Sequence, residues 1–297
     1  SSSSSPSPSP VIEPAAARDQ SRDRTRGDRS SRSSSGPSRD AEVNSLISQA
    51  DALVEQNRLV DARSIFNAAL HHPRAGDAAE FIRQRMTDLN EAIVFSTTVF
   101  EDDPWTERYT IKSGDRLSLI APKYDVDWRF IARINRISRP ERIRVGQQLK
   151  IVRGPFHAFI DKSQYRLDLY LGEPDRQGRR MYIRSFNVGL GEFDSTPTGA
   201  FVVRDDSRLV NPPWTNPRTG EHFDADDPMN PIGERWIGLM GVDEETRDLD
   251  GYGIHGTIDH DSIGEQRSMG CVRLLPEDVN LIYEVMMEEK STVFIRD

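Results

Sequence analysis

The sequence predicts a multidomain chain: an N-terminal helical segment, a small unit of two strands and two helices, and a mostly antiparallel β domain with one C-terminal helix. Three observations support this. Apolar residues recur at three- and four-residue steps through residues 41–95, which is typical of amphipathic helices. Turn residues separate short strand and helix patterns over residues 109–152. After Phe156 the apolar period shortens to two, which indicates strands.

Composition separates the first 40 residues from the rest of the 297-residue chain. Residues 1–40 contain 14 Ser and 5 Pro with no aromatic residue, so we expect a disordered Ser/Arg/Pro-rich linker. They carry a net charge of +2, from 7 Arg against 4 Asp and 1 Glu. Since the whole chain has a net charge of −9, residues 41–297 carry −11. An acidic body argues against a nucleic-acid-binding protein. There is no run of 18 apolar residues, so an export signal or membrane anchor is expected only upstream of Ser1.

Residues 41–100 are predicted to form helices. The first apolar run ends at Asn57, the second ends before Pro73, and Asp77 is expected to cap a third helix. Residues 46–70 resemble a tetratricopeptide-type helical hairpin. One such unit is too short for a free-standing solenoid, so we expect a spacer or a docking surface for another protein through residues 41–95.

Residues 105–153 are predicted to form a small strand–helix–helix–strand unit. Asp115 is expected near the cap of the first helix, and Asp127 is expected to cap the second. Asn135 is expected to end the second helix, and residues 145–152 are expected to form a turn and the final strand.

This unit resembles a LysM module. The matching positions are Tyr109 and Ile111, Gly114-Asp115-x-Leu117, Ile120-Ala121, Asn135 and Gly146-Gln147-x-Leu149. The resemblance implies binding of N-acetylglucosamine-containing glycans in a shallow groove formed by Ser113, Gly114, Asp115, Arg116 and Ile137. Pro122 departs from the family pattern. A proline inside a helix costs ~3 kcal/mol, so we expect that helix to be displaced or broken. A purely structural module is the alternative.

The remaining residues, 155–297, are predicted to be mostly strands with one helix. The expected strands cover residues 157–161, 165–170, 181–188, 199–203, 237–240 and 292–295, and the expected helix covers residues 277–290.

Cys271 is the only cysteine, which excludes an intrachain disulfide and a multi-cysteine zinc site. The ordinary interpretation of a single cysteine is a small buried apolar residue. Thiol chemistry on an amide instead needs a thiolate, a base and backbone donors for the oxyanion. Cys271 follows Gly270, and His255 also has glycine neighbours, so both could supply this chemistry. One cysteine and one histidine alone are weak evidence for a catalytic site.

Residues 155–297 also resemble the L,D-transpeptidase catalytic domain of the YkuD type. The matching motifs are Ser195-Thr196-Pro197-Thr198-Gly199-Ala200-Phe201, Asn211-Pro212-Pro213-Trp214, Asn230-Pro231-Ile232-Gly233-Glu234-Arg235-Trp236-Ile237, Gly253-Ile254-His255-Gly256-Thr257 and Ser268-Met269-Gly270-Cys271-Val272-Arg273. The resemblance implies a β-sandwich-like fold and a bacterial envelope enzyme, in the periplasm or cell wall, that cross-links peptidoglycan.

The resemblance also assigns roles to residues of the site. Cys271 would be the nucleophile and His255 the base, oriented by the carbonyl of Gly256. The backbone N–H groups of Gly270 and Cys271 would form the oxyanion hole, and Ser268 would support that loop.

Three further residues are candidates for substrate contact. Arg273 would hold the loop or a substrate carboxylate, with a structural ion pair as the alternative. Trp214 and Trp236 would line the donor cleft, with a place in the core as the alternative.

One position departs from the family. Met269 stands where the family usually has His, and a thioether cannot transfer protons. We still expect activity because His255 is retained. His260, five residues after His255, is a weak candidate to replace the missing imidazole. His157 is expected in a strand and His222 in a polar loop.

The predicted function is peptidoglycan L,D-transpeptidation without a metal or another cofactor. Cys271 would attack the L,D bond of a tetrapeptide stem, release D-alanine and pass the acyl group to an amine. Two alternatives are an L,D-carboxypeptidase that uses water and a non-catalytic peptidoglycan-binding scaffold. The resemblance further implies acylation by carbapenems. The expected partner is peptidoglycan, with an envelope protein as a second partner through residues 41–95.

Overall fold

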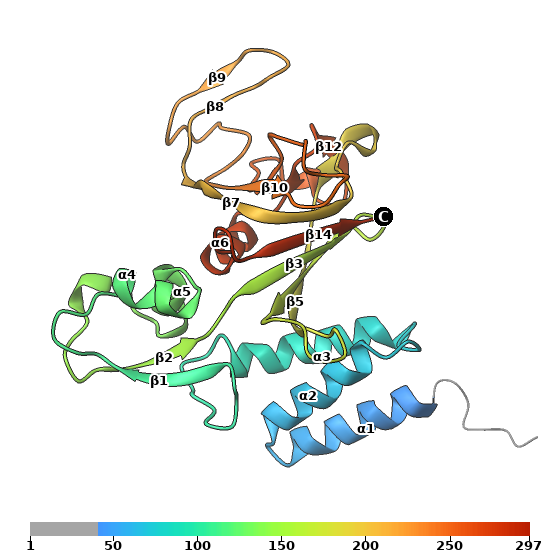
Figure 1. Ribbon diagram of the computed structural model, residues 1–297, viewed down its shortest axis with the longest axis vertical. Helices are drawn as coiled ribbons and strands as arrows, with labels where there is room; N and C mark the ends of the chain where they lie inside the picture. Colours follow the sequence, from blue (N-terminus) through green and yellow to red (C-terminus); the bar gives the residue numbers. More distant parts are fainter. Residues whose placement is uncertain (1–40) are drawn as a thin grey trace, which may run out of the picture. The chain divides into compact units, whose positions relative to one another are not determined.

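The computed structural model describes residues 41–297 (Figure 1). The disordered linker that the sequence predicts for residues 1–40 lies outside the described residues. Within residues 41–297, no helix is both long and apolar enough to cross a membrane.

The chain begins with three helices, as predicted. They are α1 (Ala41–Glu55), α2 (Leu59–Leu70) and α3 (Ala78–Ile93). Asn57 has a φ of 58°, a left-handed conformation that asparagine tolerates, and it separates α1 from α2. The prediction that Asp77 caps α3 is wrong, because Asp77 has helical backbone angles and its side chain makes no capping hydrogen bond. Phe66, Ile82 and Met86 bury the inner faces of α2 and α3.

A strand–helix–helix–strand unit follows. It consists of β1 (Thr106–Thr110), α4 (Leu117–Ile120), a 3₁₀ turn (Ala121–Tyr124), α5 (Trp128–Ile134), a second 3₁₀ turn (Pro140–Arg142) and β2 (Gln148–Val152). Strands β1 and β2 pair antiparallel. The α-helix stops at Ile120, and Pro122 lies in the 3₁₀ turn, so the proline breaks the helix as expected.

The two aspartates predicted at the helix starts of this unit have different roles. The Asp127 carboxylate accepts the N–H of Arg129 at 2.8 Å and caps α5, as predicted. Asp115 directly precedes Arg116, the N-cap of α4, and is therefore near the cap as predicted. Its carboxylate accepts from the Lys112 N–H and the Tyr109 hydroxyl, both at 2.8 Å, and therefore closes the turn before α4.

The C-terminal part is built on one eight-stranded sheet with the order β13-β11-β10-β7-β14-β3-β4-β5. Its strands are β3 (Phe156–Asp161), β4 (Arg166–Leu171), β5 (Met181–Asn187), β7 (Gly199–Val210), β10 (Arg235–Gly241), β11 (Gly253–His255), β13 (Val272–Arg273) and β14 (Thr292–Arg296). Pairs β14–β3 and β11–β13 are parallel and the others antiparallel, so the mostly antiparallel domain is confirmed.

Two short strand pairs and one helix complete this part. The pairs are β6 (Leu190–Gly191) with β12 (Gln266–Ser268) and β8 (Trp214–Thr215) with β9 (His222–Phe223). Helix α6 (Pro276–Val285) ends before the predicted Lys290, because Met286 takes an extended backbone.

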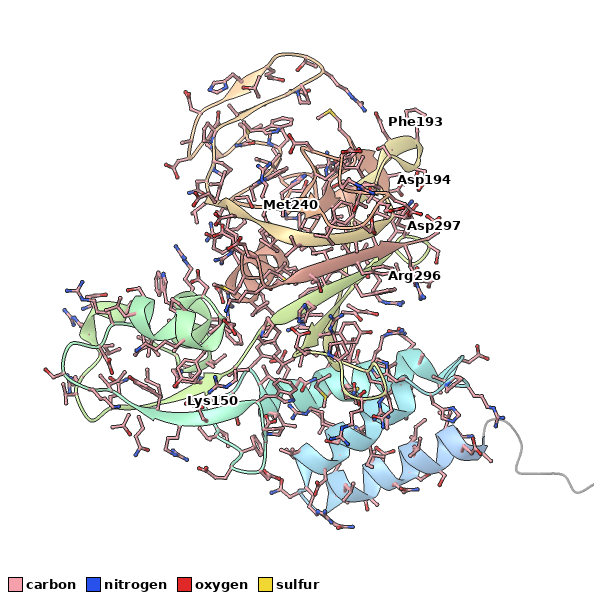
Figure 2. All side chains as sticks on the ribbon, viewed as in Figure 1. Lys150, Phe193, Asp194, Met240, Arg296 and Asp297 are labelled. Carbon is pink, nitrogen blue, oxygen red and sulfur yellow. The ribbon has the colours of Figure 1, made fainter. Side chains whose placement is uncertain are left out.

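A buried ionic cluster joins the helices to the small unit. Arg63 of α2 and Asp103, just before β1, form an ion pair of 2.6 Å, with side chains 1% and 0% exposed. Lys150 of β2, labelled in Figure 2, donates its ammonium to the carbonyls of Ile93 and Ser96 at the C-terminal end of α3. Cations stabilise that end of a helix.

A second ion pair joins the small unit to α6. Arg133 of α5 binds both carboxylate oxygens of Glu284, at 2.5 and 2.7 Å, and Glu284 is 7% exposed. The backbone N–H of Asp127 also donates to the Glu284 carbonyl at 3.0 Å. The unit is therefore packed between the helices and α6.

We expect Arg63→Met to destabilise the protein by ~3–5 kcal/mol, because it leaves the buried Asp103 carboxylate without its partner. Chemical unfolding followed by circular dichroism measures this free energy. The double variant Arg63→Met/Asp103→Leu should recover much of the loss.

The control is the exposed pair of Arg58 and Asp61, also 2.6 Å apart, with side chains 57% and 46% exposed. Arg58→Met should cost less than ~1 kcal/mol. Equal losses for Arg58→Met and Arg63→Met would contradict a special role for the buried pair.

Candidate active site

Strand register brings the predicted site residues together. In the sheet β11 lies between β10 and β13, and the register pairs His255 with Trp236 on one side and with Arg273 on the other. Cys271 directly precedes β13. Residues that are 16 or more positions apart in the sequence are thereby placed at one edge of the sheet.

A cavity of about 310 Å³ opens at this edge. Six predicted site residues line it: Cys271, His255, Ser268, Arg273, Trp214 and Trp236. Gly256 and Gly270 do not line it. Sequence reasoning missed other parts of the wall, namely Pro217, Pro231, Ile232, Asp250, Gly251 and Tyr252. Pro231 and Ile232 lie inside a motif quoted for the resemblance, whereas no motif included residues 250–252.

The loop before Cys271 is closed by a buried serine. The Ser268 hydroxyl donates to the Cys271 carbonyl at 2.6 Å and accepts the Gly270 N–H at 3.1 Å. Gly270 has a φ of 124°, and a Cβ there would lie 2.7 Å from the Tyr252 ring, so only glycine fits. The support expected from Ser268 is thus seen in the geometry.

This loop changes the expected oxyanion hole. In the structure the Gly270 N–H, predicted to bind an oxyanion, donates to the Ser268 hydroxyl at 3.1 Å. The Cys271 N–H has no acceptor within residues 41–297 and remains available.

The imidazole of His255 is 4% exposed, and its position is defined on two sides. Its Nδ1 donates to the Gly256 carbonyl at 2.6 Å, the arrangement expected for Gly256, which leaves Nε2 as the basic nitrogen. The ring stacks on Trp236 with centroids 5.8 Å apart and planes 16° from parallel. Burial lowers the pKa of His255 to about 4, and the charge of Arg273 acts in the same direction, against the carbonyls of Gly256 and Ile232.

The thiol of Cys271 is partly exposed to the cavity but mostly surrounded by protein atoms. Burial raises its pKa to about 11, against the backbone of Gly253 and the charge of Arg273, which both lower it. Its Sγ lies 3.7 Å from the Gly251 carbonyl. In residues 41–297 it makes no hydrogen bond to His255. At neutral pH the resting pair is therefore a thiol and a neutral imidazole.

Arg273 is a cation without a carboxylate partner. No Asp or Glu of residues 41–297 lies within 4.0 Å of its guanidinium, so the structural ion pair weighed for it does not form in the described residues. Its Nε is buried without a hydrogen-bond partner. Burial lowers the pKa of Arg273, which still leaves it charged.

The two tryptophans belong to the cavity wall, not to the core. Both are partly exposed. Trp214 stacks on Phe223 across the β8–β9 hairpin, with centroids 6.0 Å apart. Met269 lines the same cavity, whereas His260 is exposed and does not, so the structure gives no support for His260 as a replacement imidazole.

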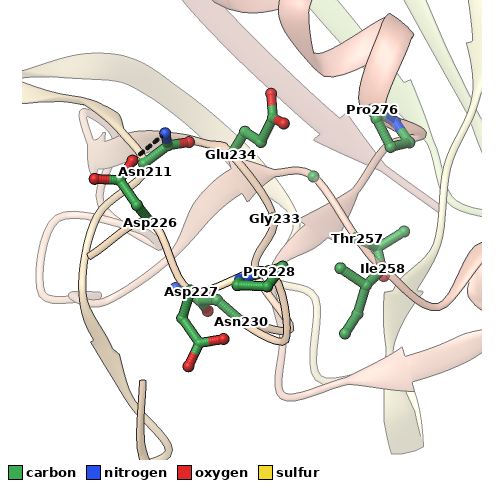
Figure 3. Close-up of a pocket in the computed structure, with 11 residues that line it drawn as sticks. Asn211, Asp226, Asp227, Pro228, Asn230, Gly233, Glu234, Thr257, Ile258 and Pro276 are labelled. Carbon is green, nitrogen blue, oxygen red and sulfur yellow. Dashed lines mark hydrogen bonds between the residues drawn. The ribbon is translucent and has the colours of Figure 1, made fainter. Parts of the chain in front are cut away.

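An acidic pocket lies next to this cavity (Figure 3). Asp226, Asp227 and Glu234 line it, and Asn211, which also lines it, donates to Asp226. It reaches Gly256 and Thr257 but contains neither Cys271 nor His255. Within residues 41–297, no three His, Cys, Asp or Glu side chains gather closely enough to hold a metal ion.

The small unit has a groove, but only some of the residues predicted to line it do so. Of the predicted glycan-binding residues, Asp115 and Arg116 line a groove of about 660 Å³, while Ser113, Gly114 and Ile137 do not. Ile137 packs against the apolar core instead. The opposite wall is built by Trp128, Pro140, Glu141 and Ile143. Trp128 follows the Asp127 cap, and this aromatic residue was a signal that sequence reasoning missed.

Comparisons with known proteins identify two domain families in this chain. Residues 155–295 match the family model of the L,D-transpeptidase catalytic domain, YkuD, and residues 109–152 match that of the LysM domain. A Bacillus subtilis (strain 168) protein named "Putative L,D-transpeptidase YqjB" is 32% identical over 104 residues, which cover 34% of this chain and 53% of that protein. The "Putative L,D-transpeptidase YkuD" of the same strain is 25% identical over 179 residues, which cover 58% of this chain and 88% of that protein. This chain thus spans about half the length of YqjB.

One solved structure, titled as an L,D-transpeptidase from Mycobacterium tuberculosis H37Rv, has 15% identity and a TM-score of 0.35 over 52% of this chain and 63% of that one. This likeness does not bear on the chemistry of the site. The family models cover both described modules. The chain therefore contains a YkuD-type L,D-transpeptidase catalytic domain, residues 155–295, preceded by a LysM domain, residues 109–152.

Proposed function

We propose that this chain is a peptidoglycan L,D-transpeptidase of the bacterial envelope, with Cys271 as nucleophile. One observation carries the proposal: the only thiol of the chain shares a cavity with a buried imidazole whose Nδ1 is held by a carbonyl. The domain family supplies the reaction class.

The first half-reaction forms a thioester. The Cys271 sulfur attacks the carbonyl carbon of the L,D bond after the third residue of a tetrapeptide stem, and its proton passes to Nε2 of His255. The Cys271 N–H donates to the oxyanion. The tetrahedral intermediate then breaks its C–N bond, and D-alanine leaves with the proton returned from His255.

Proton transfer inside the pair is central to this mechanism. With a thiol pKa of about 11, only roughly one molecule in 10⁴ would hold a free thiolate at pH 7. The neutral imidazole must therefore accept the proton as the bond to carbon forms. A pKa of about 4 makes His255 a weak base, but one that is unprotonated at neutral pH.

Substrate contacts follow from the cavity wall. The unpaired guanidinium of Arg273 is suited to a stem-peptide carboxylate. The indole faces of Trp214 and Trp236 offer apolar surface to the stem. Met269 occupies a place in the wall where it contributes packing and no proton transfer.

The second half-reaction resolves the thioester. An amine from a neighbouring stem attacks the thioester carbon, its proton passes to His255, and the sulfur leaves as the thiol, which gives a cross-link between third residues. Water in place of the amine would make the enzyme an L,D-carboxypeptidase through the same residues. The LysM groove, with Asp115, Arg116 and Trp128, would hold the chain on glycan strands and raise the local concentration of stems.

The products formed from muropeptides test whether the protein catalyses L,D-transpeptidation. Purified tetrapeptide muropeptides incubated with the protein should give cross-linked dimers, detected by mass spectrometry, and Cys271→Ser should give less than a few per cent of them. Trimmed tripeptides without dimers would instead support the carboxypeptidase. Unchanged muropeptides would contradict both enzymes.

Covalent trapping tests the nucleophile and the effect of Met269. Intact-mass measurement should show one carbapenem adduct per chain, since Cys271 is the only thiol. His255→Ala should slow the acylation at least tenfold, because the proton then has no acceptor. Met269→His should change the rate by less than about tenfold, or ~1.4 kcal/mol of barrier.

The opposite pattern would favour the scaffold. If the natural chain stays unmodified while Met269→His is acylated, the protein is catalytically silent and binds the wall without chemistry.

The pH dependence tests the proton transfer. Between about pH 5.5 and 9 the acylation rate should change less than about threefold, because His255 stays neutral above its pKa of about 4 and Cys271 stays protonated below about 11. Below pH 4 the rate should fall as His255 takes up a proton.

His255→Ala provides the comparison. Its rate should rise about tenfold per pH unit, because the proton must then be lost to solvent. The same rise in the unaltered protein would show that His255 does not take the proton.

A further inference from the structure

A second cavity, of about 300 Å³, is lined by residues of the sheet and of the N-terminal helices. Strands β3, β4 and β14 form its floor with His157, Phe159, Asp168 and Phe294. Helices α2 and α3 and the connection from β4 to β5 form its rim. None of its lining residues belongs to the candidate active site.

The cavity is rich in arginine. Arg83, Arg166, Arg180 and Arg296 line it, and Arg296 is labelled in Figure 2. Three of them, all but Arg180, pair with the buried carboxylates of Asp168 and Asp161. Arg83 lies 3.5 Å and Arg166 2.9 Å from Asp168, while Arg296 lies 3.4 Å from Asp161.

Arg83 also lies 3.6 Å from the exposed carboxylate of Glu80, so three of the four arginines have a carboxylate partner. Arg180 is the unpaired member. Within residues 41–297 no carboxylate lies within 4.0 Å of it, and its Nε is buried without a hydrogen-bond partner. Its backbone is held in place by α2, since its carbonyl accepts from Asn67 at 3.1 Å and His71 at 2.8 Å.

His157 presents a second unpartnered donor to the cavity. It is 2% exposed. Its Nδ1 accepts the backbone N–H of Thr292 at 3.1 Å and lies 2.8 Å from the Thr292 hydroxyl, which can donate to the same nitrogen. The proton of the neutral ring is therefore on Nε2, and Nε2 is buried with no hydrogen-bond partner in residues 41–297. The nearest carboxylate, that of the exposed Glu173, is 3.8 Å away, beyond hydrogen-bonding distance.

These two groups converge. The charge of Arg180 is close enough to His157 to add to burial in lowering the pKa of His157 to about 4, so the ring offers a neutral N–H donor at pH 7. Buried polar groups in folded proteins are almost always hydrogen-bonded. A neutral donor beside an unpaired guanidinium in a cavity matches an oxyanion, whose oxygens accept from both.

We propose that this cavity is a binding site for an oxyanion, a phosphate or carboxylate group, held by Nε2 of His157 and the guanidinium of Arg180. The stacked rings of Phe159 and Phe294, with centroids 5.7 Å apart, would pack against the carbon skeleton that bears the anion. The site does not depend on the activity of Cys271.

Isothermal titration calorimetry of the full chain with sodium phosphate, and separately with sodium acetate, tests the site at pH 7.4 and constant ionic strength. At least one anion should bind saturably, at one site per chain. Tighter binding of phosphate indicates a phosphate-bearing ligand, and tighter binding of acetate indicates a carboxylate. Binding of neither anion overturns the proposal.

Two variants with a matched control locate the site. Arg180→Gln should weaken binding at least tenfold. Arg179→Gln, which removes the neighbouring guanidinium that pairs with Asp175 outside the cavity, should change it less than twofold. Glu173→Gln should bind at least as tightly as the natural chain, since it removes a competing carboxylate. Unchanged affinity in Arg180→Gln, equal losses in both arginine variants, or weaker binding by Glu173→Gln would overturn the assignment.

Discussion

The buried cluster of Arg63, Asp103 and Lys150 is the constraint on which the arrangement of the described chain depends. The ion pair and the ammonium cap lie where α2, the end of α3 and both strands of the LysM domain meet. A buried charge without its partner is costly, so these elements must keep their positions together. With Arg133 and Glu284 on the other side, the LysM domain is packed into the body of the protein and does not hang on a linker. Its groove therefore has a set direction relative to the catalytic domain, so a ligand held in the groove would orient that domain.

The candidate active site depends on a different constraint, the register of three strands. Pairing His255 with Trp236 and with Arg273 makes one wall from three separate motifs, and the Ser268 hydrogen bonds hold the loop that carries Cys271. The same burial that shapes this cavity favours the uncharged forms of Cys271 and His255. At rest the proton is therefore on the sulfur, and a thiol is a much poorer target for oxidants than a thiolate.

The N-terminal helices position residues of the proposed oxyanion site. Sequence patterns suggested only a spacer or a docking surface. In the structure α2 and α3 lie against β5 and the connection before it. Asn67 and His71 hold the backbone at Arg180, and Asn90 donates to the carbonyls of Tyr182 and Ile183. The helices thereby form the rim of the proposed oxyanion site. A ligand there would contact both the helices and the sheet.

The sequence by itself determined the main element types and the order of the modules, because apolar period, glycine turns and ordered motifs are local properties. The same motifs made Cys271 and His255 the candidates for nucleophile and base. The sequence also predicted the break at Pro122, since a proline ring has the same effect in any helix.

Tertiary structure decided what depends on distant partners. Asp77 precedes a helix as a capping residue would, yet its side chain makes no cap, whereas Asp115, near the start of α4, closes a turn onto Tyr109. Gly270 and Cys271 both offer an amide, but only packing shows that Ser268 occupies the first. His157 reads as an ordinary strand residue. Only the fold shows that its Nε2 is buried without a partner beside Arg180, because that depends on elements more than 20 residues away.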